Sequence, residues 1–91
     1  MILSKVKVDD FDQFWSVFST KGAAKRKEHG SKGSRTFRSV EDPNTVYVAV
    51  DWDEESFKGF VSDPEMREVF KEGGLQGQPE RIADLVGELD S

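Results

Sequence analysis

The segment GSRTFRSVEDPNTVYVAVDWDEESFKGFVSDPEMREVFKEG, from Gly33 to Gly73, decides the fold of this 91-residue chain. Alternating side chains predict two strands, over residues 34–40 and 45–52, and the Asp-Pro-Asn sequence between them is typical of a tight turn. Strands joined by so short a connection must pair antiparallel. The segment therefore predicts a β-hairpin, and its second half predicts a helical region that packs back on one face of the sheet.

The helical region after the hairpin is expected to be broken in the middle. Asp53 is a typical N-cap residue, and apolar residues recur behind it at helical spacing. Pro64 disfavours helical geometry at Asp63 and suits the first turn of a new helical piece. The apolar positions are Phe57, Phe60, Val61, Met66, Val69 and Phe70. They predict one buried stripe that continues across the break.

The N-terminal third predicts a strand followed by a helix. Residues 2–8 alternate between a mostly apolar face and a more polar one, which fits a strand. Asp9 and Asp10 then supply an N-cap and an acidic first turn for a helix that we expect to end near Gly30. The apolar stripe of this helix consists of Phe11, Phe14, Trp15 and Phe18.

The C-terminal residues leave two alternatives open. Apolar residues recur at helical spacing between residues 82 and 89, which favours a short helix, although Gly87 opposes it by about 1 kcal/mol. The preceding order of strand, helix, two strands and helix instead lacks one strand to complete a ferredoxin-like βαββαβ fold. The pattern alone does not decide between strand and helix for residues 81–89.

Several short stretches together resemble the antibiotic-biosynthesis-monooxygenase-like family, a branch of the dimeric α/β-barrel superfamily. They are Gly33–Ser39, Glu41–Asn44, Val46–Val48, Asp51–Asp53, Phe60, Ser62–Met66, Gly73 and Pro79–Glu80. The resemblance implies that the residues after Pro79 and Glu80 form a fourth strand. The expected fold is α+β and ferredoxin-like, with a single domain over residues 1–91, a four-stranded antiparallel sheet and two helices on one face.

The predicted sheet also gives a physical reason for a homodimer. Two helices cover only one face of a four-stranded sheet, so the apolar residues of the other face stay exposed in a monomer. These are either the side that carries Tyr47 and Ala49 or the side that carries the valines of residues 45–52. Pairing two identical sheets about a two-fold axis buries this surface. The dimeric α/β barrel implied by the resemblance is such an arrangement.

The composition excludes several kinds of site and partner. The chain has no Cys and one His, which excludes disulfides and thiolate-bound metals and makes a His-rich metal site unexpected. No apolar run approaches the ~20 residues of a membrane span, and the first residues do not fit a signal peptide, so a cytoplasmic protein is expected. The net charge of −5 argues against nucleic acid as a partner.

Positive charge is nevertheless concentrated between Lys21 and Arg38, where the only acidic residue is Glu28. One interpretation is a solvated helix end whose cations complement the helix dipole. The other is a docking surface for an anionic small molecule or for the acidic part of a second subunit. The sequence favours the first interpretation without excluding the second.

Six aromatic residues are candidates for binding a ligand. Proteins of the resembling family hold small ligands in a cleft between the sheet and the helices. The resemblance implies that this cleft is lined by Trp15, Phe18, Trp52, Phe57, Phe60 and Phe70. A helical aromatic stripe also fits an ordinary hydrophobic core, so both interpretations stay open.

Three residues are candidates for catalysis. His29 can act as an acid or base, or it can simply complement the dipole at a helix end. Arg35 and Arg38 point to opposite faces of one strand, so that one of them, Arg38 in our assignment, faces the cleft or the barrel. There it can hold an enolate or carboxylate, or pair with an acidic residue. Tyr47 can donate a hydrogen bond to a substrate oxygen or to the backbone at an interface.

The leading functional hypothesis follows from the resemblance. It is a homodimer similar to cofactor-independent monooxygenases and cyclases that act on small aromatic or polyketide-like compounds, without metal or flavin. The haem-degrading relatives use a Trp and a His on the second helix, where this chain has Phe60 and Phe70, so haem is not expected. The alternative is a non-catalytic dimeric module that binds a metabolite or a protein, because no acid–base pair converges. Whether the chain is an enzyme is thus left open.

Overall fold

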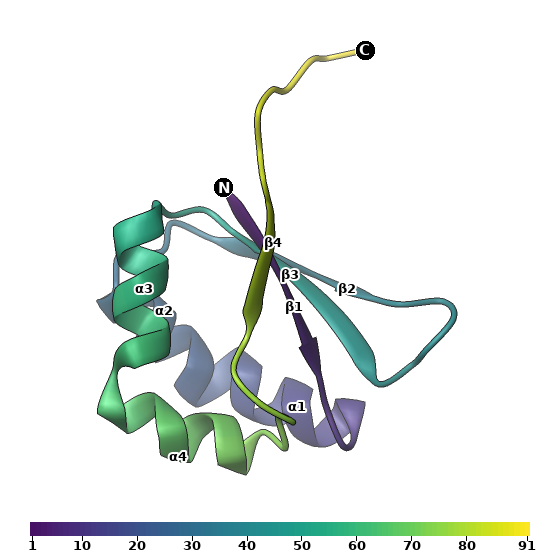
Figure 1. Cartoon of the computed structure of the whole chain (residues 1–91), viewed down its shortest axis with the longest axis vertical. Coiled ribbons are helices and arrows are strands. Elements are labelled where there is room, and N and C mark those ends of the chain that lie inside the picture. Colours follow the sequence, from purple (N-terminus) through teal and green to yellow (C-terminus); the bar gives the residue numbers. More distant parts are fainter.

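The computed structural model describes all 91 residues and contains a four-stranded antiparallel sheet with helices on one side (Figure 1). In chain order the elements are β1 (Ile2–Lys7), α1 (Phe11–Val17), η1 (Phe18–Gly22), α2 (Ala23–Glu28), β2 (Ser34–Arg38), β3 (Thr45–Val50), α3 (Glu54–Ser62), α4 (Pro64–Glu72) and β4 (Glu80–Asp84). The strands lie in the order β2-β3-β1-β4. The predicted ferredoxin-like α+β fold is confirmed.

The β2–β3 hairpin is held by its turn. The N–H of Thr45 donates to the carbonyl oxygen of Asp42 at 2.9 Å, which closes a β-turn around Pro43 and Asn44. The Asp42 carboxylate accepts from the Asn44 N–H at 3.0 Å and from the Thr45 hydroxyl at 2.8 Å. These bonds fix the register in which Phe37 lies opposite Tyr47.

The second helical region is broken where the sequence predicts it. The Asp53 carboxylate accepts from the N–H of Ser56 at 2.8 Å and caps α3. Asp63 ends α3 with an extended ψ of 121° and caps α4, because its carboxylate accepts from the N–H of Glu65 at 2.9 Å. Pro64 then occupies the first turn of α4. One aspartate thus fixes the angle between α3 and α4.

The first helix contains a π-helical turn that the sequence pattern did not predict. α1 and α2 are separated by η1, which covers Phe18–Gly22. The hydroxyl groups of Ser19 and Thr20 donate to backbone carbonyls one turn earlier, at 2.6 and 2.7 Å. Such bonds weaken helices slightly, and Gly22 adds backbone freedom. π-helical turns of this kind are frequent at functional sites.

The face of the sheet that the helices cover carries the core. β1 presents Ile2, Ser4, Val6 and, just past its end, Val8 to the helices, and all four are buried. Their partners on β3 and the helices complete a core cluster of Ile2, Val6, Val8, Phe14, Val46, Val48, Val50, Trp52, Phe57, Phe60 and Met66. The predicted alternation of β1 and the predicted stripe of the second helical region are confirmed. In the first helix Phe14 is buried, Phe11 and Phe18 are partly buried, and Trp15 is exposed.

No helix covers the other face of the sheet, which we call the open face. The register places Phe37 beside Tyr47 and Leu3 beside Ala49 on this side. Phe37 is 53% exposed, whereas Leu3 and Tyr47 are half-buried. Within one chain, β3 is therefore covered on one side only.

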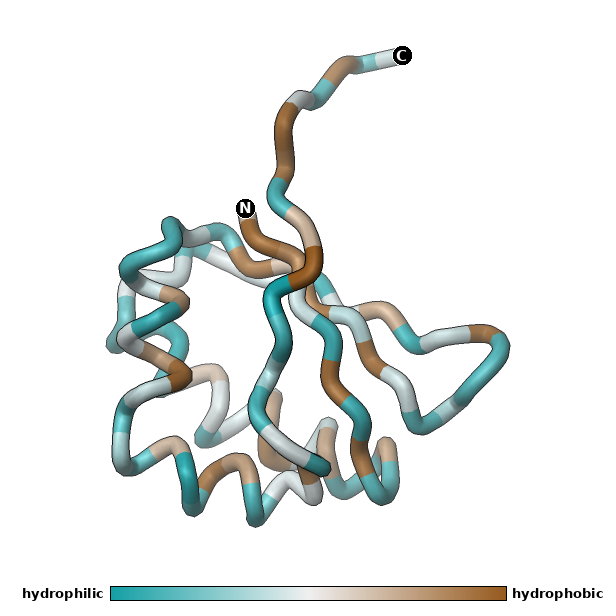
Figure 2. The backbone as a smooth tube through the Cα atoms, in the orientation of Figure 1, coloured by the Kyte–Doolittle hydropathy of each residue, from teal (hydrophilic) through white to brown (hydrophobic).

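The C-terminal alternative is resolved in favour of a strand. β4 pairs with β1 through a register shift between Leu3 and Ser4, and the last backbone bond joins the Leu85 N–H to the carbonyl of Met1 at 2.9 Å. The following residues extend away from the rest of the chain, and several of them are coloured as hydrophobic (Figures 1 and 2). Val86 and Leu89 are 98% and 90% exposed. The free edge of β1 supplies backbone hydrogen bonds to β4.

Candidate functional site

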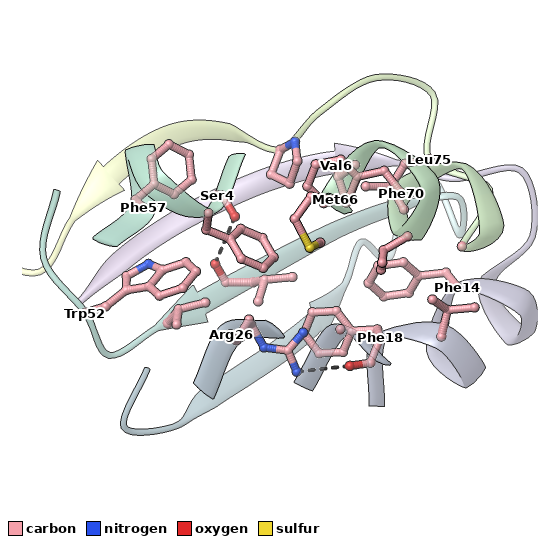
Figure 3. A pocket seen from close by; sticks show the side chains of 18 residues that line it. Ser4, Val6, Phe14, Phe18, Arg26, Trp52, Phe57, Met66, Phe70 and Leu75 are labelled. Atoms are coloured by element: carbon pink, nitrogen blue, oxygen red, sulfur yellow. Dashed lines mark hydrogen bonds between the residues drawn. The ribbon is translucent and has the colours of Figure 1, made fainter. Parts of the chain in front are cut away.

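An apolar cavity of about 50 Å³ lies between the sheet and the helices (Figure 3). Eighteen residues line it, and thirteen of them are hydrophobic. They come from β1 and β3 on the sheet side, from the helix that runs from α1 to α2, and from α3 and α4. The volume is several times the ~10–15 Å³ that one water molecule requires. A small group of atoms fits, and a whole ring requires the lining side chains to move.

Five of the six aromatic residues predicted to bind a ligand line this cavity. They are Phe18, Trp52, Phe57, Phe60 and Phe70. The ring of Phe60 lies centrally, with centroids 5.1 Å from Trp52 and 5.8 Å from Phe70. Edge-to-face and tilted contacts of this kind stabilise aromatic clusters. The same residues therefore form the core and the wall of the cavity.

The sixth predicted residue, Trp15, does not line the cavity. It is 45% exposed, and its ring stacks on Phe11 and Phe18 at centroid distances of 6.2 and 5.7 Å. Phe14, one residue earlier, is buried and lines the cavity instead. Adjacent helical residues point about 100° apart, so that only one of the two can face the sheet. The expectation for Trp15 is therefore corrected.

Arg26 of α2 is the most unusual residue of the wall. It is only 7% exposed, and it is the single titratable side chain among the lining residues. Its Nη2 donates to the Phe18 carbonyl at 3.0 Å, and its guanidinium carbon lies 3.6 Å from the centroid of the Phe18 ring (Figure 3). No carboxylate pairs with it, and burial lowers the pKa of Arg26 to about 10.

Two further polar groups belong to the wall. The indole N–H of Trp52 is buried and has no acceptor. The hydroxyl of Ser4 is buried and donates to the carbonyl of Val48 over a long 3.4 Å. The wall therefore contains one buried N–H donor without an acceptor, that of Trp52, and such groups are exceptions in folded proteins.

The sequence interpretation missed Arg26, although a signal was present. Arg26 follows Phe18 by eight residues and Gly22 by four, so it continues the helical stripe that begins at Phe14. We interpreted the stretch around it by composition, as one of several cations at a helix end. A charged residue on the apolar stripe of a helix is the pattern that could have identified it.

His29 lies outside the cavity, behind Phe60. Its Nε2 donates to the Asp63 carboxylate at 2.9 Å, and its ring meets Phe60 edge-on with centroids 5.9 Å apart. The side chain is 22% exposed. These contacts join the end of α2 to the junction of α3 and α4. An acid–base role on a ligand in the cavity has no direct path through the Phe60 ring.

Lys25 belongs to the same cluster. Its ammonium nitrogen lies 2.7 Å from Asp63, 2.8 Å from Glu28 and 2.9 Å from Glu65. Hydrogen bonds to these carboxylates, chiefly to Asp63, raise the pKa of Lys25 above 10.5. Hydrogen bonds from Lys25, His29 and the Glu65 N–H hold the pKa of Asp63 below 3.8. We call Lys25, His29 and Asp63 the helix clasp.

The other two candidates for catalysis lie elsewhere. Arg38 is exposed, donates from Nε to the Pro43 carbonyl at 2.9 Å, and lies over the Phe11 ring at 4.5 Å. Tyr47 is on the open face of the sheet. The structure therefore does not bring His29, Arg38 and Tyr47 together in one chain, because strand alternation and the helix end direct them to three different surfaces.

The positively charged segment is partly neutralised inside the chain. Lys21 pairs with Glu72 of α4 at 2.9 Å, and Lys25 pairs across the clasp. The last turn of α2 carries Lys25, Arg26 and Lys27, as the helix-dipole interpretation predicts. Among the cations of this segment, only Arg26 is buried, and it lines the cavity.

Neither a metal cluster nor a membrane helix is found. No group of three or more His, Cys, Asp or Glu side chains is arranged to hold a metal ion. None of the helices combines the length and the apolar character that crossing a bilayer requires.

Comparison with known proteins supports the fold. No family model matches the sequence, and no curated protein matches it. Among solved structures, the chain is similar to a protein from Chloroflexus aurantiacus J-10-fl that carries the name antibiotic biosynthesis monooxygenase. The match has a TM-score of 0.59 and covers 99% of this chain and 96% of that one, with 14% sequence identity. The fold implied by the resemblance is confirmed, and at this identity the likeness extends to the fold alone.

Proposed function

We propose that this chain binds a small aromatic or polyketide-like compound in the cavity between its sheet and helices. In this it would act like the cofactor-independent monooxygenases and cyclases that the sequence resembles. The observation that carries the proposal is an apolar cavity walled by aromatic rings, with few polar groups. Ligand sites typically have this composition. The fold shared with a protein named as an antibiotic biosynthesis monooxygenase supports the proposal.

The small size of the cavity sets a condition on binding. About 50 Å³ does not hold a whole aromatic ring, so side chains must move when a ring enters. Phe18 and Phe70 are only partly buried, in contrast to Phe14 and Phe60. We expect the ring to enter beside Phe18 and Phe70, because displacing a partly exposed side chain disturbs fewer contacts.

A ligand-binding assay can use the two tryptophans. The variant Trp15→Phe retains Trp52 as the only indole, so its fluorescence reports on the cavity wall; Trp52→Phe retains the exposed Trp15 and serves as the control. With a panel of phenolic and quinone compounds, we expect saturable quenching of Trp52 and a raised melting temperature. A panel that changes neither signal, or quenches both tryptophans equally, contradicts the proposal.

We also propose that the chain forms a homodimer through the open face of the sheet. Leu3, Phe37, Tyr47 and Ala49 lie together there without a covering helix. Val86 and Leu89 add apolar groups on a segment that leaves the body of the chain. A second copy of the chain would bury these groups about a two-fold axis.

Light scattering tests the dimer. The chain mass is 10.3 kDa, so a particle of about twice that mass is expected. Phe37→Lys places a charge on the open face and should shift the particle to a monomer. Trp15→Lys places the same charge on an exposed aromatic of the helical layer and should leave the dimer intact. A monomeric parent protein contradicts the proposed assembly.

A specific observation favours the alternative of a non-catalytic module. Arg26 is the only titratable residue in the cavity wall, so no side chain there accepts a proton from a ligand at neutral pH. A compound that binds in the fluorescence assay should then be recovered unchanged after incubation in aerated buffer. Conversion of the bound compound, detected by mass spectrometry and lost in Trp52→Phe or Phe60→Leu, favours the enzyme.

A further inference from the structure

We infer that the cavity recognises a planar apolar carboxylate, and that the guanidinium of Arg26 binds its charged group. The inference rests on the proposed function, because it names the class of ligand for the same cavity. It is carried by a buried cation without a counter-ion in an otherwise apolar wall. Arg26 is then a ligand-binding residue rather than a structural one.

The burial of Arg26 demands a functional explanation. A buried charge is normally paired, because removing it from water is costly. The other cation of α2 with a nearly buried side chain, Lys25, follows that rule and has three carboxylate partners. Arg26 has one hydrogen bond, to a neutral carbonyl, and no ion pair. The chain therefore keeps a cation in a place where it does not stabilise the fold through a charge partner.

The guanidinium is held in a fixed position. The Phe18 carbonyl accepts one of its five N–H groups, and the Phe18 ring covers one of its faces at 3.6 Å. On another side lies Gly22, where a Cβ atom would come within 3.1 Å of Nη1. The π-helical turn that supplies Phe18 and Gly22 thus forms a seat for the guanidinium. The guanidinium forms no other hydrogen bond within the chain.

The surroundings of the guanidinium select the chemistry of the ligand. A planar fork of N–H donors matches the two oxygens of a carboxylate. The attraction is stronger in an apolar cavity than in water. One cation without further positive groups in the wall fits a ligand with a single negative charge. The unpaired indole N–H of Trp52 offers another donor to an acceptor on the apolar part of such a ligand.

A matched pair of ligands tests the inference. Benzoate and benzamide have nearly the same shape, but only benzoate is charged at neutral pH. Their dissociation constants can be measured by NMR titration on the full chain, on Arg26→Met and on Lys27→Met. Lys27 is the exposed neighbour, so its variant removes the same charge from outside the cavity. We expect the parent and Lys27→Met to bind benzoate at least about tenfold more tightly than benzamide, and Arg26→Met to lose that preference.

The outcomes separate the two proposals. Equal binding of benzoate and benzamide by the parent protein overturns the inference and leaves the proposed function standing. A preference for benzoate that persists in Arg26→Met also overturns the inference. If neither compound, nor any larger aromatic acid and its amide, perturbs the resonances of cavity residues, the proposed function fails and the inference fails with it.

A second variant keeps the test valid if Arg26→Met does not fold. Gly22→Ala retains every charge but places a Cβ atom 3.1 Å from Nη1 and 3.3 Å from the Val17 carbonyl oxygen. The guanidinium must then shift by a few tenths of an ångström from its position beside the Phe18 ring. We expect Gly22→Ala to reduce the preference for benzoate over benzamide several-fold while benzamide still binds. An unchanged preference in this variant, with the guanidinium shown to be displaced, contradicts the inference.

Discussion

Lys25 and Arg26 are consecutive cations in α2, yet they occupy opposite environments. Lys25 turns toward α3 and α4 and meets three carboxylates within 2.9 Å. Arg26 turns toward the sheet, is 7% exposed, and meets only the carbonyl and ring of Phe18. A step of one residue along a helix rotates the side chain by about 100°, which is enough to separate a structural cation from an unpaired one.

The comparison shows a division of roles between the two sides of α2. In the helix clasp, every charged group has a partner, so the cluster can hold α2 against the α3–α4 junction. In the cavity wall, Arg26 has no charged partner and a single hydrogen bond, to the Phe18 carbonyl, and the indole N–H of Trp52 has no acceptor. Polar groups that stabilise a fold form their hydrogen bonds within it. A buried donor without an acceptor is an exception that needs another explanation, such as binding. The following predictions test that division.

The largest effect on the free energy of unfolding is expected at residues that form both the core and the cavity wall. Met66 is 1% exposed and lines the cavity, so Met66→Ala should lower the free energy of unfolding by about 2–5 kcal/mol. Chemical denaturation measures this value. Met66→Leu conserves volume and should cost less than about 1.5 kcal/mol. If both variants were equally destabilised, packing around Met66 would not be the cause.

The next largest effect is expected at Asp63. Asp63→Ala removes the partner of Lys25 and His29 and also the cap of α4. Asp63→Asn retains an oxygen that can cap α4. Asp63→Ala should therefore lower the stability more than Asp63→Asn. The folded pKa of Asp63 lies below 3.8, so the ionised form stabilises the fold above that pH and this contribution is lost as pH falls through the lower folded pKa. The gap in melting temperature between parent and Asp63→Asn should therefore narrow in acid. A gap that is constant from pH 7 to strong acid argues against a charge effect.

The sharpest contrast is expected between Lys25→Met and Arg26→Met. Lys25→Met leaves three carboxylates without their cation and should lower the melting temperature. Arg26→Met removes an unpaired buried charge, so the free energy of unfolding should stay the same or rise by up to about 2 kcal/mol. Parallel thermal and chemical denaturation of the two variants provides the comparison. A loss above about 2 kcal/mol in Arg26→Met assigns Arg26 a structural role.

The smallest effect is expected at two glycines, Gly59 beside His29 of the helix clasp and Gly22 beside Arg26. A Cβ at Gly59 would meet His29 at an ordinary 3.4 Å, so Gly59→Ala should raise the free energy of unfolding by about 0.5–1 kcal/mol through helix propensity. A Cβ at Gly22 would lie 3.1 Å from Arg26 and 3.3 Å from a backbone oxygen. The free energy of unfolding should therefore rise less in Gly22→Ala than in Gly59→Ala, or not at all. Equal gains at both sites indicate that the guanidinium is not seated against Gly22.

Much of the fold follows from local patterns. The hairpin turn at Asp42, the caps at Asp10 and Asp53, and the restart at Pro64 each depend on residues within one turn of each other. Such local chemistry can be interpreted without knowledge of the rest of the chain. Local patterns did not decide the structure of the C-terminal residues. Their apolar residues recur at helical spacing, yet they pair as a strand with β1, about eighty residues away in the sequence.

The candidate site was predictable only in part. The aromatic wall was predicted from the family resemblance, and the helical stripes identified most of its residues as inward-facing, with Trp15 as the exception. Arg26 was missed because its charge suggested a solvated position. His29, Arg38 and Tyr47 were grouped by their chemistry, and only the three-dimensional arrangement shows that they lie on separate surfaces.

The amino-acid order alone determined the N-terminal strand, the hairpin, the helical regions and the aspartates that cap the helices, because these properties arise from neighbours within a few residues. The tertiary structure decided that β4 is a strand, that the clasp neutralises Lys25, and that Arg26 is buried without a counter-ion. Each of these depends on residues far apart in the chain, and the free energy of burying a charge is defined only once its surroundings exist.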